Sequence, residues 1–221
     1  MVNRKEPLVD NHVYHVFTRS IAEYNIFRSD NDFQRFINTI NYYSAEIPPC
    51  KFSGYLRLFD KSRSEIMATI TNSAKIVKIL SFCIMPTHLH LVLEQLKENG
   101  ISKFVNTVLI SYSKYFNTKY ERKGPLWEGR FKNVLVETNE QLLHLTRYVH
   151  LNPVTASIIK KPEDWKYSSF KEYTQDECAY RNKICSFSHY LDIKPEEYRQ
   201  FVHERIDYQK ELQMIKHCLL E

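Results

Sequence analysis

The sequence is poor in the features that mark membrane, secreted and disordered proteins. Four glycines in 221 residues argue against a loop-rich or disordered chain. No apolar run reaches the length of about 18 residues that a membrane span needs, and the first residues contain no apolar signal core. The five cysteines are widely spaced without a Cys-x-x-Cys pair, which favours reduced thiols over a disulfide framework or a zinc knuckle. We therefore expect a cytoplasmic protein with no membrane partner.

The length and the hydrophobic content of 43% suit one ordinary domain with an appendage. We place the domain at residues 1–173, with a hairpin or a mobile connection near 50–75, and a small helical appendage at 174–221. In the appendage, Pro195 stands at a typical first helical position. Acidic residues outnumber basic ones toward this end of the chain, so packing on the core is favoured there over DNA binding.

Basic residues are concentrated in the middle of the chain. Residues 101–132 contain seven lysines and arginines against two glutamates. Such a zone suits a polyanion such as nucleic acid. A solvated helix face explains the charges equally well, so charge alone does not decide between the two interpretations.

Two histidines one residue apart are the most informative feature of the sequence. His88 and His90 lie in an apolar run, and on a β-strand their side chains would point to the same side, while Leu89 and Leu91 would point into a core. The pattern predicts a paired-imidazole metal site that needs a third ligand.

The pattern of apolar residues predicts an α+β fold with an antiparallel sheet and helices on one face. Strands are expected at 11–19, 76–85, 88–95 and 133–137, and helices at 30–46, 101–116 and 138–151. His15 lies in the first strand, where a structural role or a nucleic-acid contact is favoured over metal ligation. Pro86 and Thr87 supply the turn before the strand of the two histidines.

The helix at 138–151 carries a line of polar residues. Thr138 and Gln141 form a capping box at its start, and Pro153 is expected to end it near Leu151. On this helix His144, Tyr148 and Asn152 recur at i, i+4 and i+8. A divalent ion held by the two histidines and a third donor would polarise a phosphodiester for attack by the Tyr148 phenol. The pattern thus indicates DNA cleavage through a covalent protein–DNA ester.

The loop at 124–132 places Trp127 among basic residues. A large aromatic side chain in such a loop can stack on an unpaired base while its neighbours hold phosphate. Alternatively, Trp127 fills the core.

Four blocks of sequence resemble, in order, the signatures of the REP-associated tyrosine transposases, which are single-tyrosine HUH transposases. The blocks are FCIMPTHLHL at 82–91, GPLWEGRF at 124–131, YVHLNPVTA at 148–156 and PEDWKYSS at 162–169. Together they extend the resemblance over roughly residues 11–173, and their order makes it specific, whereas His-x-His alone would be weak. The family usually has Asn in place of Thr87 and often Arg in place of Thr155.

The resemblance implies a ferredoxin-like or RRM-like HUH domain that nicks and rejoins single-stranded DNA, with Mg²⁺ or Mn²⁺ as cofactor. Cleavage would leave a 5′-phosphotyrosine and a free 3′-hydroxyl, and the strands could be rejoined without ATP. His88 and His90 match the metal pair, Tyr148 matches the nucleophile, and Asn152 is expected as the third ligand.

The expected partner is single-stranded or hairpin DNA, bound by a monomer or a homodimer. The residues expected to contact it are Arg19, Lys114, Arg122, Lys123, Trp127, Arg130, Lys132 and Arg147. Two alternatives compete with a transposase: a module that binds DNA hairpins without chemistry, and a metal-stabilised structural protein in which the histidines merely pack. The intact set of Tyr148, the two histidines and Asn152 favours an enzyme over the first alternative, and the basic zone disfavours the second.

Overall fold

A four-stranded antiparallel sheet forms the centre of the protein. The structure is a computed structural model that describes residues 7–175 and 183–208. The strands are β1 (Val13–Arg19), β2 (Val77–Ile84), β3 (His88–Gln95) and β4 (Lys132–Val136), and their order in the sheet is β2-β3-β1-β4. All pairs are antiparallel. The strands predicted from the sequence are confirmed.

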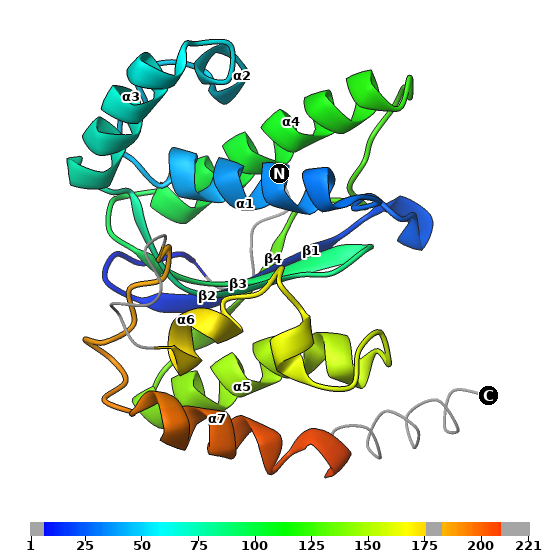
Figure 1. The fold of residues 1–221 in the computed structure, drawn as a ribbon. Coiled ribbons are helices and arrows are strands. Elements are labelled where there is room, and N and C mark those ends of the chain that lie inside the picture. Colours follow the sequence, from blue (N-terminus) through cyan, green and yellow to red (C-terminus); the bar gives the residue numbers. More distant parts are fainter. Residues whose placement is uncertain (1–6, 176–182, 209–221) are drawn as a thin grey trace.

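Two helices pack against one face of this sheet. They are α1 (Asp30–Tyr43) and α4 (Gly100–Lys119) (Figure 1). The resulting succession β1-α1-β2-β3-α4-β4, once the small helices are set aside, is the ferredoxin-like arrangement. The sequence therefore predicted the α+β class and the antiparallel sheet correctly.

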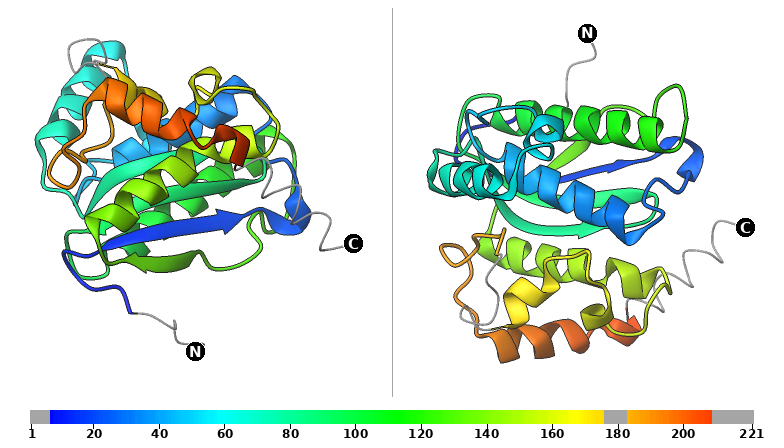
Figure 2. Two further views of the ribbon diagram at one scale, coloured as in Figure 1. Left: turned by 90° about the horizontal axis from the view of Figure 1, so that it is seen from below. Right: turned by 45° about the horizontal axis from the view of Figure 1, so that its top comes forward.

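Helices also cover the other face, where the sequence led us to expect helices on one face alone. These are α5 (Asn139–Thr155), α6 (Phe170–Thr174) and α7 (Pro195–His203), and the two views of Figure 2 show the sheet between the two helical layers. The short 3₁₀ turns η1 (Ile21–Glu23) and η2 (Pro162–Asp164) lie in the connections. All residues of β3 after His88 are buried, and a strand that is buried on both faces needs cover on both.

Residues 50–75 form neither a hairpin nor an unstructured connection. They contain α2 (Phe52–Tyr55) and α3 (Asp60–Asn72). The apolar stretches that suggested strands contain Ile66 and Ile70, which are four residues apart, and Ile70 packs with Phe52 and Tyr42 in a small cluster of its own. A helical period was therefore present, but the apolar stripe is narrow.

Helix α5 begins as predicted and extends one turn beyond its predicted end. The hydroxyl of Thr138 accepts a hydrogen bond from the backbone N–H of Gln141 at 3.1 Å. The helix then continues through Pro153 to Thr155. Proline removes one backbone donor, but the carbonyl of Asn152 still accepts from the N–H of Ala156 at 2.9 Å. The prediction that the helix ends at Leu151 is wrong for this reason.

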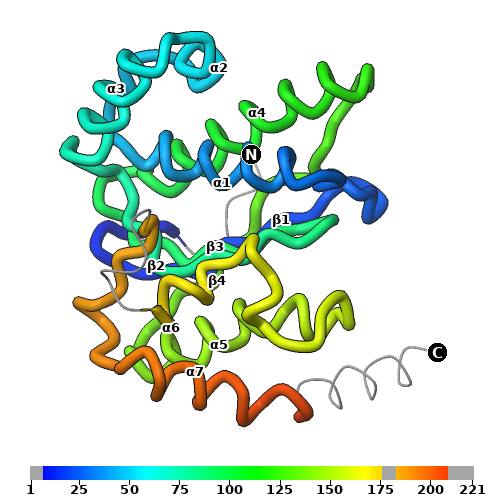
Figure 3. Tube along the Cα trace, in the orientation of Figure 1, coloured from blue at the N-terminus to red at the C-terminus, as the bar shows by residue number. Residues whose placement is uncertain are grey.

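Helix α7 packs against α5 and α6, and for this part of the expected appendage the packing that the sequence favoured is observed. In α7, Tyr198 and Val202 are fully buried in the main core, and the trace in Figure 3 shows α7 running alongside α5. The parts of the expected appendage at 176–182 and 209–221, which include Cys178 and Cys218, lie outside the described residues.

Cys50, Cys83 and Cys185 are free thiols. Within residues 7–175 and 183–208, no helix combines the length and the apolar character that a bilayer crossing requires.

A buried carboxylate joins the two helices of the first layer. Asp32, near the start of α1, accepts hydrogen bonds from Lys119 at 2.7 Å, Tyr115 at 2.8 Å and Tyr120 at 2.7 Å, all at the end of α4. Burial alone would raise the pKa of Asp32, but the hydrogen bonds from Lys119 and the two tyrosines lower it to about 2. Because this pKa is below that of the unfolded chain, the carboxylate stabilises the fold above pH 4, and this stabilisation is lost as the pH falls toward 2.

We expect Asp32→Asn to lower the free energy of unfolding by about 3 kcal/mol at pH 7, because it leaves Lys119 without its buried partner. Urea unfolding monitored by circular dichroism measures this change. The difference between the two proteins should shrink as the pH approaches 2. The neighbouring exposed Asp30→Asn serves as the control. An equal loss in both variants would contradict the role given to Asp32.

Candidate functional site

The two histidines lie at the start of β3, at the end of the sheet. In the β1–β3 register, His88 is opposite Arg19 and His90 is opposite Phe17. The turn before them is held by the residue that follows β1, because the carbonyl of Thr87 accepts a hydrogen bond from the N–H of Ser20 at 2.8 Å. The backbone that carries the histidines is therefore fixed by the strand and by the turn.

Helix α5 brings Tyr148 to the histidines. Its ring lies with an edge-to-face geometry 5.7 Å from the ring of His90, measured between centroids. Its side of α5 faces β1 and β3, and 41% of Tyr148 remains exposed to solvent. The phenol is thus next to the imidazole pair and also accessible to a ligand.

A cavity of about 560 Å³ joins these residues. It is lined by His88, His90, Tyr148 and Asn152. The structure therefore brings together the proposed metal pair on β3 with the proposed nucleophile and the proposed third ligand on α5, although His90 and Tyr148 are 58 positions apart in the sequence.

His15 also belongs to the site, although the sequence analysis did not place it there. Its Nε2 lies 2.9 Å from Nδ1 of His90, and the two rings are stacked with centroids 5.2 Å apart. On β1 it precedes by two residues Phe17, which is opposite His90, so the strand alternation alone places it on the same face. The local sequence, however, does not show which strand pairs with β3.

Burial keeps the imidazoles of the site neutral. It lowers the pKa of His15 to about 4, and the pKa values of His88 and His90 are also lowered, mainly by burial. A neutral imidazole has one nitrogen that can bind a metal. Nδ1 of His90 is engaged with His15 and Nδ1 of His88 lies 3.1 Å from the hydroxyl of Thr87, so Nε2 is the remaining nitrogen of each ring.

Asn152 is held close to Tyr148. Its Nδ2 donates to the backbone carbonyl of Tyr148 at 2.9 Å, which leaves its carboxamide oxygen as the remaining polar atom. Burial raises the pKa of Tyr148, and the hydrogen bond with Asn152 opposes this rise. The free phenol is therefore protonated at neutral pH and needs help to become a nucleophile.

The donor set limits how a cation could be held. In the part of the chain that the structure describes, no three His, Cys, Asp or Glu side chains are grouped as a metal site. Two imidazoles and the carboxamide oxygen of Asn152 do supply three neutral donors at one cavity. The residues therefore fit a divalent ion that keeps water or substrate oxygens as its other ligands.

Of the residues expected to contact DNA, Arg19, Arg130 and Lys132 line this cavity. Arg19 forms an ion pair with Glu128. Glu23 and Glu128 line the same cavity, and sequence reasoning missed both because each is a single acidic residue in a connection.

Four other residues of that prediction lie away from the cavity. Trp127 packs against the core and its indole N–H donates to the hydroxyl of Ser113 at 3.0 Å, which agrees with a core-filling role. The guanidinium of Arg147 lies 4.1 Å from the ring centroid of Phe201 in α7. Arg122 donates to the carbonyl of Gly124 at 3.2 Å, and Lys123 is exposed in the same loop.

The last of the expected DNA contacts, Lys114, and the helix residue His144 also lie away from the cavity. Lys114 lies on α4 and lines other hollows, which are described below. His144, which the sequence placed in line with Tyr148, contacts Phe201 with ring centroids 5.6 Å apart. Of the three residues that recur along α5, Tyr148 and Asn152 therefore line the cavity, whereas His144 lies at the interface with α7.

Comparisons with known proteins concern the family resemblance and the fold of the chain. Residues 57–152 match the family model described as "Transposase IS200 like". A candidate REP-associated tyrosine transposase of Haemophilus influenzae is 29% identical over 103 residues, which cover 41% of this chain and 57% of that protein. The solved structure of a REP-associated tyrosine transposase bound to a REP hairpin superposes with a TM-score of 0.52 and 14% identity, over 87% of this chain and 99% of the other. The chain resembles the REP-associated tyrosine transposases.

The resemblance noted in the sequence is thus confirmed. The match to the curated relative spans a little over half of its length, and the solved relative supports the fold of the REP-associated tyrosine transposases at low sequence identity. The matched residues 57–152 include both histidines, Tyr148 and Asn152.

We expect the phenol of Tyr148 to titrate above pH 10, because burial raises its pKa. The protein can be labelled with ¹³Cζ-tyrosine, and the resonance that disappears in Tyr148→Phe can be followed by NMR as the pH is raised. The exposed Tyr208 provides the comparison in the same spectra. A midpoint for Tyr148 below pH 10 would contradict this assignment of its environment.

Proposed function

We propose that the protein is a metal-dependent transposase that nicks and rejoins single-stranded DNA through a covalent bond to Tyr148. The observation that carries this proposal is the position of Tyr148. Its ring is 5.7 Å from that of His90, in a cavity that it shares with His88 and Asn152. The match to the IS200-like transposase model over these residues supports it.

The side chains have separate tasks in this reaction. A bound Mg²⁺ or Mn²⁺ supplies positive charge to the scissile phosphate. His88, His90 and the carboxamide oxygen of Asn152 are the residues that would hold it. His15 orients the ring of His90 through their hydrogen bond of 2.9 Å, as outer partners do at metal-binding histidines.

The chemical step exchanges one ester for another. The Tyr148 oxygen forms a bond to phosphorus and loses its proton, while the bond from phosphorus to the 3′-oxygen breaks and that oxygen gains a proton. The products are a 5′-phosphotyrosine and a free 3′-hydroxyl. Because the number of phosphoester bonds is unchanged, a 3′-hydroxyl can attack the phosphotyrosine in the reverse direction and rejoin DNA without ATP.

The basic side chains at the cavity favour DNA as the substrate. Arg130 and Lys132 lie on the loop and strand beside the histidines, where they can contact phosphates next to the reacting one. The solved relative is bound to a REP hairpin, so a hairpin with a single-stranded extension is the form of DNA that we propose for this chain.

A second candidate function is hairpin binding without chemistry. The ion pair between Arg19 and Glu128, which both line the cavity, would then serve to limit the access of phosphate. The gathering of Tyr148, the two histidines and Asn152 around one cavity favours the enzyme, because simple binding does not require that set.

With Mn²⁺ and a single-stranded oligonucleotide that contains its target, we expect the protein to form an adduct that survives denaturing electrophoresis. A label on the 3′ end of the oligonucleotide should stay with the protein, and a label on the 5′ end should not, because the tyrosine retains the 5′-phosphate. Tyr148→Phe should abolish the adduct. The control Tyr208→Phe, which removes the hydroxyl of an exposed tyrosine, should retain it. An adduct of Tyr148→Phe would show that another residue is the nucleophile.

We expect His90→Ala to lose measurable Mn²⁺ binding and His15→Phe to weaken it about 10- to 100-fold, because the second variant removes only the partner that orients His90. Isothermal titration calorimetry in the absence of DNA measures both effects. His189→Gln changes an exposed histidine and should bind Mn²⁺ like the parent. Parent-like binding by His90→Ala would refute the proposed metal site.

A further inference from the structure

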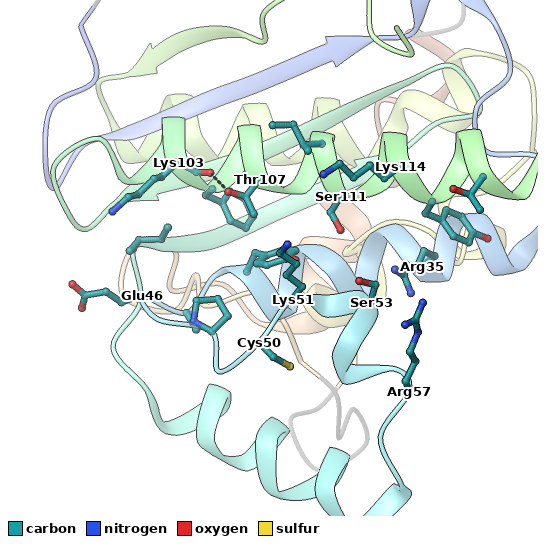
Figure 4. A pocket seen from close by; sticks show the side chains of 18 of the residues that line it. Arg35, Glu46, Cys50, Lys51, Ser53, Arg57, Lys103, Thr107, Ser111 and Lys114 are labelled. Carbon is teal, nitrogen blue, oxygen red and sulfur yellow. Dashed lines mark hydrogen bonds between the residues drawn. The ribbon is translucent and has the colours of Figure 1, made fainter. Parts of the chain in front are cut away.

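A long basic groove lies in the other helical layer, on the side of the sheet opposite Tyr148. It has a volume of about 800 Å³ and runs between α4 and the segment that connects α1 to α2 (Figure 4). Three of its lysines belong to the basic zone at 101–132, and Lys114 was among the residues expected to contact DNA. The mechanism proposed above does not use the groove. Part of its wall comes from residues 45–57, where the sequence suggested the end of a helix and then a hairpin or a mobile connection.

The charge of the groove is almost entirely positive. Six basic side chains line it: Arg35, Lys51, Arg57, Lys103, Lys114 and Lys119. The acidic residue in the lining is Glu46, which points away from the groove in Figure 4 and pairs with Lys97 at 3.6 Å. Lys119 is paired with Asp32, but within the described part of the chain the other five have no carboxylate partner.

Arg35 is held in place by two aromatic rings. Its guanidinium carbon lies 4.5 Å from the ring centroid of Phe52 and 5.1 Å from that of Tyr115. Its Nε is buried and has no hydrogen-bond partner within residues 7–175 and 183–208. In Figure 4 the guanidinium groups of Arg35 and Arg57 point toward each other across the groove. Two cations that share a space gain from an anion placed between them.

The length of the groove suits a chain of phosphates better than a single small anion. Lys103, Thr107, Ser111, Lys114 and Thr118 line it along one side of α4. At a rise of about 1.5 Å per residue, this side is about 22 Å long. That length corresponds to about six base pairs of duplex at about 3.4 Å each.

The groove also suits a duplex better than a single strand. Single-strand sites usually offer exposed aromatic faces on which bases stack. Here Phe104 is fully buried, and Arg35 lies over the ring of Tyr115. Beside the exposed Ile110, the polar groups that remain accessible in the groove are cations and hydroxyls. Such groups bind the phosphate backbone and do not read bases.

A third hollow connects the groove with the cavity of Tyr148. It has a volume of about 580 Å³. It shares Lys114 and Thr118 with the groove and Gly129 and Arg130 with the cavity. The three together form a continuous surface that passes around the loop of Trp127 from one side of the sheet to the other.

We infer that this groove binds the phosphate backbone of double-stranded DNA, such as the stem of a hairpin whose single-stranded part lies in the cavity of Tyr148. The inference rests on the proposed function for the position of the single strand. It adds a duplex-binding site and the residues that form it: Arg35, Lys51, Arg57 and Lys103, together with Lys114.

The test compares binding of two fluorescein-labelled oligonucleotides by anisotropy: a hairpin with a single-stranded extension, and the extension alone. In the triple variant Lys51→Gln, Arg57→Gln, Lys103→Gln, we expect binding of the hairpin to weaken at least 10-fold more than binding of the extension. The slope of the logarithm of affinity against the logarithm of salt concentration should fall by about 3 for the hairpin, because each lost phosphate contact reduces it by about 1.

The matched control is Lys160→Gln, Lys161→Gln, Lys171→Gln, which removes the same charge from residues that line none of the three cavities. It should keep the parent's preference for the hairpin. Equal affinity and equal salt slope in the groove variant and the parent would overturn the inference, as would an equal loss for both oligonucleotides. Absence of any covalent adduct would overturn the proposed chemistry alone, because anisotropy reports on the groove without it.

Discussion

The pairing of β1 with β3 is the interaction on which the site depends. It places Phe17 opposite His90 and Arg19 opposite His88, and it brings His15 within hydrogen-bonding distance of His90. A shift of this register by one residue would turn the histidines toward α1 and α4, and would turn Leu89 and Leu91 toward the cavity. Because Leu89 and Leu91 are fully buried in the core, such a shift is strongly disfavoured. The burial of the apolar side chains of β3 therefore determines which way its two histidines point.

The second requirement is that α5 lies across the same face, and a buried polar cluster provides it. His150, two residues after Tyr148, is completely buried, and its two nitrogens lie 2.7 Å from the hydroxyls of Tyr198 and Ser169. Burial lowers its pKa to about 3, so the ring is neutral and both contacts are satisfied. Unpaired polar groups at this depth would be costly, and the cluster therefore specifies how α5, α6 and α7 meet. Tyr148 occupies the side of α5 that remains open to the cavity.

The sequence predicted those parts of the site that a local period determines. The alternation along β3 placed His88 and His90 together, and the helical spacing of α5 placed Tyr148 near Asn152. The role of His15 was not predictable in this way, because its contact with His90 joins residues 75 positions apart and depends on strand order. The helices within residues 50–75 were missed because their apolar stripe is narrow, and the extent of α5 was misjudged because one missing donor at Pro153 does not end a helix whose next turn is already bonded.

Under the proposed function, the two layers of helices divide the demands that a covalent reaction with DNA makes. On one side of the sheet, burial keeps imidazoles neutral and a phenol protonated, which suits a small site for a single phosphate. On the other side, the groove beside α4 presents six cations, five of which lack carboxylate partners among the described residues, over a length of several base pairs. Contacts with many phosphates can then contribute binding energy far from the phosphate that reacts. These contacts do not require charged side chains to be buried beside Tyr148. In the proposed complex, the duplex would lie in the basic groove on one side of the sheet, and the single strand would reach the cavity of Tyr148 on the other side. Each part of the DNA would then meet an environment that suits it.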